Sequence, residues 1–223
     1  MFFKKKYKIL GVVNHLGIMP DMDKIVSSEE NITLFLKSVK DTISFCKDAD
    51  IKYLSLYLLG YLYKEDYEEL YFLKRFINKI RADAFFKDVK FSVVGDWTEL
   101  NGIQDALKDI ILEEREEPKL TLTLFINYSS RSEIIDACRI IAKKVLIEKL
   151  DSDFVNTSAI EELMKDSGPD TSLIIFFNNN SFNDFIGFKA LRAKFHYIEK
   201  SFLNFSEDDV YQALEKVGLA KKI

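Results

Sequence analysis

The chain has 223 residues, of which 48% are hydrophobic and 30% are charged, and its formal net charge is −4. This composition is typical of a globular protein with enough apolar residues for one core. Acidic and basic residues are interspersed without a basic excess, which excludes the charge pattern of a nucleic-acid-binding protein, so we expect no nucleic-acid partner.

The first residues combine aromatic and basic side chains, Phe2 and Phe3 followed by Lys4–Lys6. No apolar segment with a small-residue cleavage site follows them, and no run reaches the roughly 18 apolar residues that a membrane-spanning helix needs. We therefore expect a cytoplasmic protein, and a peripheral contact with a membrane surface stays open.

Six short apolar runs bounded by polar residues are predicted to be strands. They are Tyr7–Val13, Tyr53–Leu59, Val89–Val94, Leu120–Asn127, Leu173–Phe177 and Phe195–Ile198. Most of these runs are apolar on both faces, as the strands of a buried parallel sheet are.

Apolar residues at spacings of three and four predict amphipathic helices between these strands. The four stripes are Ile32, Phe35, Leu36, Val39, Ile43 and Cys46; then Leu70, Leu73, Ile77 and Ile80; then Ile103, Leu107, Ile110 and Ile111; and then Ile134, Cys138, Ile141 and Val145. Because both cysteines lie in such stripes, we expect two buried, reduced thiols and no disulfide. A last helix is predicted from about Ser206, an N-cap with Asp209 three residues on, to Val217, with Gly218 as its stop.

The alternation of strands and helices predicts an α/β fold, a single mostly parallel six-stranded sheet with helices on both faces and right-handed crossovers. No linker rich in Pro or Gly divides the chain, so we expect one domain over residues 1–223. Ligands of such sheets bind beyond the carboxyl ends of the strands, and the residues that follow the strands are therefore the candidates for function.

Four stretches resemble the cis-prenyltransferases, the isoprenyl transferase family that includes undecaprenyl diphosphate synthase. Ile51–Tyr57 is similar to the family's I-K-Y-L-T-L-Y strand, and Val94–Asp96 to its I-G-D turn. Asn127–Ile134 resembles the N-Y-G-G-R-x-E-I motif with two serines in place of the glycines, and Asn204–Asp209 resembles the P-D-F-T-x-x-D opening of the last helix. The family residues kept in the third stretch, which the resemblance links to the motif or to dimer formation, are Asn127, Tyr128, Arg131 and Glu133.

The resemblance implies a transferase that uses Mg²⁺ to add isopentenyl diphosphate units to an allylic diphosphate. In this family the first strand ends in M-D-G-N-G-R-W, whose Asp handles the magnesium diphosphate. Aligned on Gly17, the Asp position holds Asn14 and the Arg position holds Ile18, so neither charge is present. We interpret Asn14, His15, Gly17 and Ile18 as the remnant of a diphosphate pocket, and we assign no catalytic residue and no metal ligand.

Further phosphate-handling motifs of the family are also replaced. Where the resemblance places R-T-S-G-E-x-R, after Leu173–Phe177, the chain has Asn178–Ser181, and the nearest carboxylate is Asp184. Gly60–Lys64 stands where the family has S-T-E-N-W-x-R, and Asn31–Thr33 stands near its G-H-K. Because losing one preorganised charge-stabilising group costs about 100-fold to 1000-fold in rate, these losses predict an impaired enzyme. We expect no cofactor, and Mg²⁺ only if activity remains.

Several alternatives stay open. A different register across the first loop would let Asp21 or Asp23 supply the missing acid. His15 is either a pocket-lining residue or a general base, and His196 is favoured as an edge or interface histidine. The run Asn178–Asn180 is either a polar ligand cradle or a loop with left-handed backbone.

Two functions follow from these observations. The first is a degenerate cis-prenyltransferase homologue, a pseudoenzyme that works as a binding or partner subunit in polyprenyl diphosphate metabolism. It would form a homodimer, or a heterodimer with a cis-prenyltransferase, with an isoprenoid ligand left open. The chain lacks the R-x-G tail of the family's accessory subunit, which argues against catalytic support. The alternative is an active isoprenyl transferase whose remodelled site combines Asn14, His15, Asp184 and Lys64.

Overall fold

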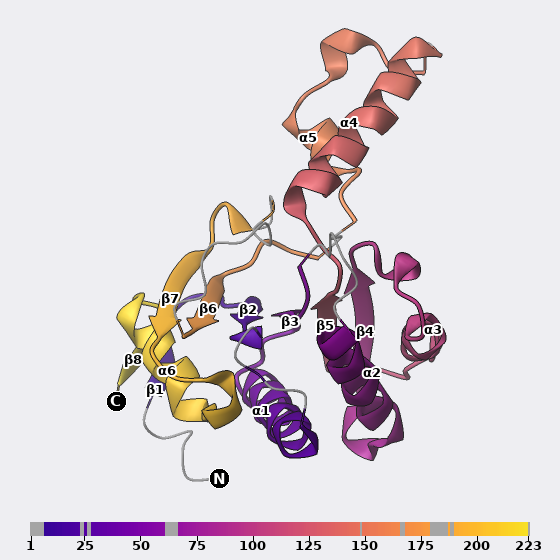
Figure 1. Cartoon of the computed structure of the whole chain (residues 1–223). Coiled ribbons are helices and arrows are strands. Elements are labelled where there is room, and N and C mark those ends of the chain that lie inside the picture. The colour runs from indigo at the N-terminus through magenta and orange to yellow at the C-terminus, as the bar shows by residue number, and fades with distance from the viewer. Residues whose placement is uncertain are drawn as a thin grey trace.

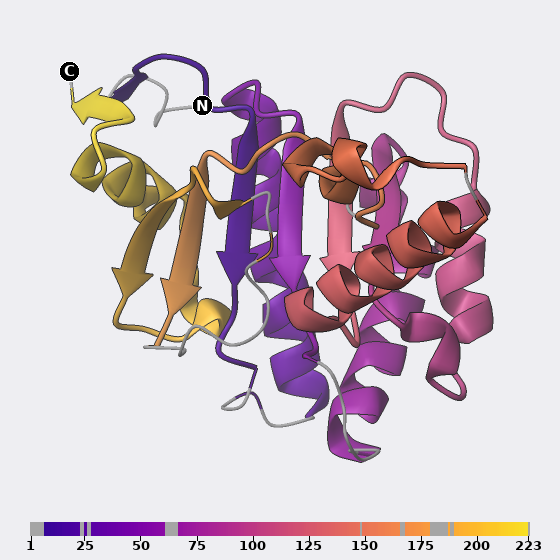
Figure 2. The same cartoon turned by 90° about the horizontal axis from the view of Figure 1, so that it is seen from above.

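The computed structural model describes residues 7–22, 25, 28–60, 67–147, 149–165, 168–178, 187 and 190–222. Within these ranges, six strands form one parallel sheet in the order β4-β5-β3-β2-β6-β7 (Figures 1 and 2). They are β2 (His15–Met19), β3 (Tyr53–Tyr57), β4 (Val89–Val94), β5 (Leu120–Phe125), β6 (Leu173–Phe177) and β7 (Lys194–Ile198). Two further strands, β1 (Tyr7–Ile9) and β8 (Ala220–Lys222), pair antiparallel outside this sheet. The predicted α/β fold is confirmed.

Helices cover the two faces of the sheet unequally. The helices are α1 (Glu29–Asp48), α2 (Tyr67–Ala82), α3 (Gln104–Leu112), α4 (Ser130–Leu146), α5 (Thr157–Glu161) and α6 (Glu207–Lys216), with short 3₁₀ turns η3 (Ala84–Phe86), η4 (Trp97–Glu99), η5 (Ser152–Phe154) and η7 (Phe202–Asn204). The main apolar core joins one face of the sheet to residues of α1, α2, α3 and α6. On the other side, α4 rises away from the sheet together with α5 (Figure 1). Of the helices in the described ranges, none combines the length and the apolar sequence that crossing a bilayer requires.

The first predicted strand is wrong. Only Tyr7–Ile9 of the predicted Tyr7–Val13 is extended into a strand, and it pairs with β8 instead of joining the main sheet. Gly11 has a φ of +78° and turns the chain after β1. The first strand of the main sheet along the chain is β2, which begins with His15. The His15 ring is buried and hydrogen-bonded, and this is how a polar residue is accommodated in the core of the sheet.

The other strands agree more closely with their predictions. β4 and β6 have the predicted bounds. β5 stops at Phe125, because Asn127 has a φ of +51°, which ends extended backbone. β3 stops at Tyr57, after which the amides of Leu58 and Leu59 both donate to the carbonyl of Phe125.

The apolar stripe predicted for α1 is confirmed, since its six residues are all buried. The predicted start and stop signals of α6 are confirmed as well. Ser206 and Asp209 form the predicted capping box, and Gly218 has a φ of +74° just beyond the helix. The stripe predicted for α4 is confirmed only in part: Ile141 is buried, Ile134 and Val145 are half-buried, and Cys138 is exposed. The buried residues of α4 are Ser130, Glu133, Ala137 and Ile141.

The two cysteines consequently differ. Cys46 is buried in α1, as predicted, and burial raises the pKa of its thiol well above the ordinary value. Cys138 is exposed on α4, so the prediction of a second buried thiol is wrong. The helical periodicity of α4 is present, but Cys138 lies on its exposed side.

Candidate functional site

Because all six strands run parallel, their carboxyl ends meet at one edge of the sheet, where ligands of this fold class bind (Figure 2). A polar or small residue lies one to three positions after each strand there. These are Asp21 after β2, Gly60 after β3, Asp96 after β4, Asn127 after β5, Asn178 after β6, and Glu199 and Lys200 after β7.

Asn14 lies at the opposite edge. It precedes β2; its carbonyl accepts from the amide of Tyr53 at 3.1 Å, and its own amide donates to Ser172 Oγ at 3.3 Å. The assignment of Asn14 to the carboxyl end of the first strand is therefore wrong. It followed from taking Tyr7–Val13 as the first strand of the main sheet.

His15 is a buried residue of the sheet. Its Nε2 lies 2.7 Å from Ser55 Oγ, and its Nδ1 lies 2.8 Å from the carbonyl oxygen of Pro169. A carbonyl only accepts, so Nδ1 donates to Pro169, and the second ring nitrogen, Nε2, is hydrogen-bonded to the serine hydroxyl. His15 is the first residue of β2 and lies away from the carboxyl ends of the strands. This position supports neither a role as a general base nor a role in lining a pocket at that edge.

Gly17 and Ile18 are both in the interior of β2. A Cβ at Gly17 would lie 3.0 Å from Ile174 Cγ1 and 3.4 Å from Tyr57 Cε2. Ile18 is fully buried in the main core. The close approach of neighbouring side chains explains the glycine, and packing explains the isoleucine.

Asp21 occupies the position that the sequence left open for a catalytic acid. It follows β2 at the carboxyl edge and is 0% exposed. Its carboxylate accepts from Asn178 Nδ2 at 2.7 Å, from the Phe202 amide at 2.9 Å and from Ser201 Oγ at 3.3 Å. These donors come from the end of β6 and from the start of η7, so the carboxylate ties three segments together. Asp23, the other candidate, lies outside the described residues.

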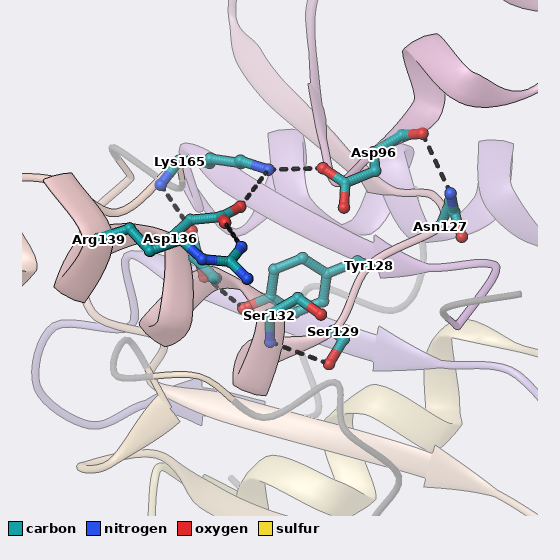
Figure 3. Close-up of polar contacts among 9 residues, drawn as sticks. Asp96, Asn127, Tyr128, Ser129, Ser132, Asp136, Arg139 and Lys165 are labelled. Atoms are coloured by element: carbon teal, nitrogen blue, oxygen red, sulfur yellow. Dashed lines mark hydrogen bonds and ion pairs between the residues drawn. The ribbon is translucent and has the colours of Figure 1, made fainter. Parts of the chain in front are cut away.

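The N-Y-S-S-R-S-E stretch forms a second polar cluster, beyond β5 (Figure 3). Asn127 Nδ2 donates to the Asp96 carbonyl at 3.1 Å, and the Asp96 amide donates back to the Asn127 carbonyl at 3.0 Å. This pair locks the ends of β4 and β5 together. Gly95 makes it possible, since a Cβ there would lie 2.1 Å from the carbonyl oxygen of Ile126.

Tyr128 and Glu133 are paired in the interior of this cluster. The Tyr128 hydroxyl donates to Glu133 Oε2 at 2.6 Å, and the Lys165 amide donates to Glu133 Oε1 at 2.5 Å. Ser129 is the N-cap of α4 and accepts from the Ser132 amide at 3.3 Å, which gives this serine a structural use. Arg131 is exposed in the first turn of α4.

Lys165 is a member of the cluster that the sequence did not predict. Its Nζ lies 2.6 Å from Asp96 Oδ1 and 3.7 Å from Asp136 Oδ2 (Figure 3). Burial alone lowers the pKa of Lys165, but the hydrogen bond to Asp96 and the charges of Asp96, Asp136 and Glu133 raise it above the ordinary value. Lys165 belongs to none of the family motifs. Of the Lys165–Asp96 ion pair, only Asp96 lies in such a motif, the Val94–Asp96 turn.

Some predicted residues cannot be placed. Lys64, Asp184 and the remainder of the polar run after Asn178 lie outside the described residues. Asn178 itself has a φ of +52°, as expected for a loop tolerant of left-handed backbone. His196 lies on β7, the last strand of the sheet order, as predicted for an edge histidine.

Among the described residues, no group of three or more Asp, Glu, His or Cys side chains lies close enough together to hold a metal ion. Mg²⁺ is usually bound through one or two carboxylates together with substrate phosphates. At the carboxyl edge of the sheet Asp21 is such a carboxylate, and it accepts three hydrogen bonds from its own chain.

The family model described as putative undecaprenyl diphosphate synthase matches residues 28–221. An isoprenyl transferase of Agrobacterium fabrum is 26% identical over 196 residues, which cover 81% of this chain and 76% of the relative. A ditrans,polycis-undecaprenyl-diphosphate synthase of Micrococcus luteus, specific for (2E,6E)-farnesyl diphosphate, is 25% identical over 190 residues, or 80% and 75% of the two chains.

Solved structures agree on the fold. Lavandulyl diphosphate synthase from Lavandula x intermedia, crystallised with dimethylallyl diphosphate, superposes with a TM-score of 0.77 at 22% identity, covering 91% of this chain and 94% of that one. A probable undecaprenyl diphosphate synthase from Campylobacter jejuni gives 0.75 at 18% identity, covering 96% and 99%.

Proposed function

Since the chain belongs to the cis-prenyltransferase family, we propose that it is a non-catalytic member that serves as a binding or partner subunit. One observation supports this above the others: Asp21, the carboxylate that follows the central strand, is buried and accepts hydrogen bonds from Asn178, Ser201 and Phe202. These contacts connect the end of β2 to the end of β6 and the start of η7, so Asp21 has a structural use that requires no metal ion.

The charge around the edge of the sheet supports the same proposal. A diphosphate brings several negative charges, which transferases balance with Arg, Lys and metal ions. Among the described residues one or two positions after the strands, Lys200 after β7 is the one Lys or Arg, and its Nζ is paired with Asp209 Oδ2 at 2.6 Å. The charge of Lys165, in the second polar cluster, is offset by Asp96 and Asp136.

A second candidate, an active isoprenyl transferase with a remodelled site, draws on the position of Asp21. The family resemblance puts the magnesium-binding acid after the first strand of the sheet, and Asp21 lies two residues after β2. In that case Asp21 exchanges its present donors for Mg²⁺ and an isoprenoid diphosphate when substrate binds.

The two candidates are separated by one assay. The full chain is incubated with farnesyl diphosphate, isopentenyl diphosphate and Mg²⁺, with the Agrobacterium relative as positive control, and products and thermal shift are measured. We expect no elongated product. Turnover that is lost in Asp21→Asn, while circular dichroism shows a folded variant, would establish the active enzyme.

The partner is expected to dock on α4. Ile135 and Leu146 of this helix are exposed and, eleven residues apart, lie on the same helical face, and exposed apolar faces mark interaction surfaces. A second copy of this chain is the partner that we test first, and a cis-prenyltransferase is the other. Light scattering after gel filtration should give a dimer that Ile135→Glu with Leu146→Glu converts to a monomer. Leu112→Glu, an equally apolar and exposed site on α3, is the matched control and should leave the dimer intact.

A further inference from the structure

The two ends of the described chain meet in the β1–β8 ribbon (Figure 1). In its register, Ile9 is opposite Ala220 and Lys8 is opposite Lys221. Ile9 and Ala220 pack on the main core, whereas Lys8 and Lys221 are exposed. Like charges placed directly opposite each other destabilise a strand pair, so folding alone does not explain this arrangement.

Positive charge is concentrated in the two sequence segments that contain the ribbon strands. Residues 1–12 and 216–223 contain seven lysines and no acidic residue, which leaves a net charge of −11 on the remaining residues. Three of the seven, Lys8, Lys221 and Lys222, are exposed in the ribbon itself. Lys4–Lys6 lie outside the described residues but directly precede Tyr7 in sequence.

Apolar side chains are exposed beside these lysines. Leu10 continues the ribbon through a hydrogen bond from its amide to the Leu219 carbonyl at 2.7 Å, and its side chain is 41% exposed. Gly11 turns the chain, and Val12 is then 87% exposed. In sequence, Phe2 and Phe3 precede Lys4–Lys6, outside the described residues.

We propose that this end face, made of Lys8, Leu10, Val12, Lys221 and Lys222, docks on the surface of an anionic lipid bilayer. Basic residues near such a surface each add binding free energy, and neighbouring apolar side chains insert between the headgroups. A nucleic acid would match the lysines but offer no apolar phase for Leu10 and Val12. The net charge of −11 on the rest of the chain would also repel a long polyanion. This proposal does not depend on whether the protein is catalytic.

Co-sedimentation of the full chain with vesicles tests the proposal. We expect binding to vesicles of phosphatidylcholine with phosphatidylglycerol, little binding to phosphatidylcholine alone, and release at about 1 M salt, where the Debye length falls to ~3 Å. The double variant Lys8→Glu with Lys221→Glu should lower the partition coefficient by about 30-fold or more. Because two glutamates keep a like-charged pair across the ribbon, its folding cost resembles that of the wild type.

Two further variants define the surface. Lys74→Glu with Lys90→Glu makes the same change of charge at exposed lysines on α2 and β4, and should bind as the wild type does. Val12→Ser should lower binding by about 5-fold without changing the melting temperature. The proposal would be overturned by any of three results. They are an equal loss of vesicle binding in the Lys8/Lys221 and Lys74/Lys90 variants, vesicle binding that does not depend on phosphatidylglycerol, and binding to a DNA duplex but not to vesicles.

Discussion

Replacing Asp21 with Asn is the sharpest test of the reading that this carboxylate is a structural tie. The variant keeps one oxygen that can still accept from the Phe202 amide and Ser201 Oγ, both of which contact Oδ1. The other oxygen becomes an NH₂ group, which faces the NH₂ of Asn178 at the position of a 2.7 Å hydrogen bond.

The magnitude follows from those contacts. A buried hydrogen bond to a charged group contributes ~1.5–3 kcal/mol, and here one is lost outright and two are weakened. We expect Asp21→Asn to lower the free energy of unfolding by about 3 kcal/mol, measured by urea denaturation. For a chain of this size that corresponds to a fall of about 6–12 °C in melting temperature.

A charge swap makes the test specific. In the double variant Asp21→Asn with Asn178→Asp, the new NH₂ group faces a new carboxylate, so we expect recovery of about 1–2 kcal/mol. Asp105→Asn, at a side chain that is 98% exposed, is the control and should change stability by less than about 0.5 kcal/mol. An Asp21→Asn variant as stable as the wild type, or a swap that recovers nothing, would refute the reasoning.

The remaining predictions concern the second cluster and one surface ion pair. Asn127→Gly should cost about 1 kcal/mol for the lost hydrogen bond, and Asn127→Ala about 1 kcal/mol more because φ is +51°, as thermal melts would show. Tyr128→Phe leaves an oxygen of the buried Glu133 without its hydroxyl donor and should cost about 2 kcal/mol in urea denaturation. The hydrogen bond from Lys40 holds the pKa of Asp83 in the folded protein below its ordinary value. The ion pair therefore stabilises the folded protein at pH values above the pKa of Asp83 in the unfolded chain, and this stabilisation is lost as the pH falls through the pKa of Asp83 in the folded protein. Lys40→Met should therefore be less stable than the wild type at pH 6, with a smaller difference at pH 3; an unchanged difference would contradict this.

The sequence predicts the sheet well where a strand is a continuous apolar run. Val89–Val94 and Leu173–Phe177 have sharp polar boundaries, and both strands have the predicted bounds. β2 was missed because His15 interrupts its apolar pattern, and the satisfaction of that ring by Ser55 and Pro169 is tertiary information. That error placed Asn14, and not Asp21, after the first strand of the sheet.

The candidate site was predictable only in part. The Asn127–Ile134 motif was found from residue types and spacing, and its position after β5 is confirmed. Periodicity predicted α4 as a helix but not its orientation, since apolar spacing does not say which surface covers the stripe. The contact of Lys165 with Asp96 joins residues from distant parts of the chain, so no local pattern predicts it.

The antiparallel β1–β8 ribbon also has a mechanical consequence. Tyr7 is opposite Lys222, so the chain enters β1 and leaves β8 at the same point. A force applied to the two ends therefore opens the ribbon one backbone hydrogen bond after another, like a zipper, and does not shear all of them together. The parallel sheet is loaded only after the ribbon has opened, so stretching should release a short, weak segment before the core yields.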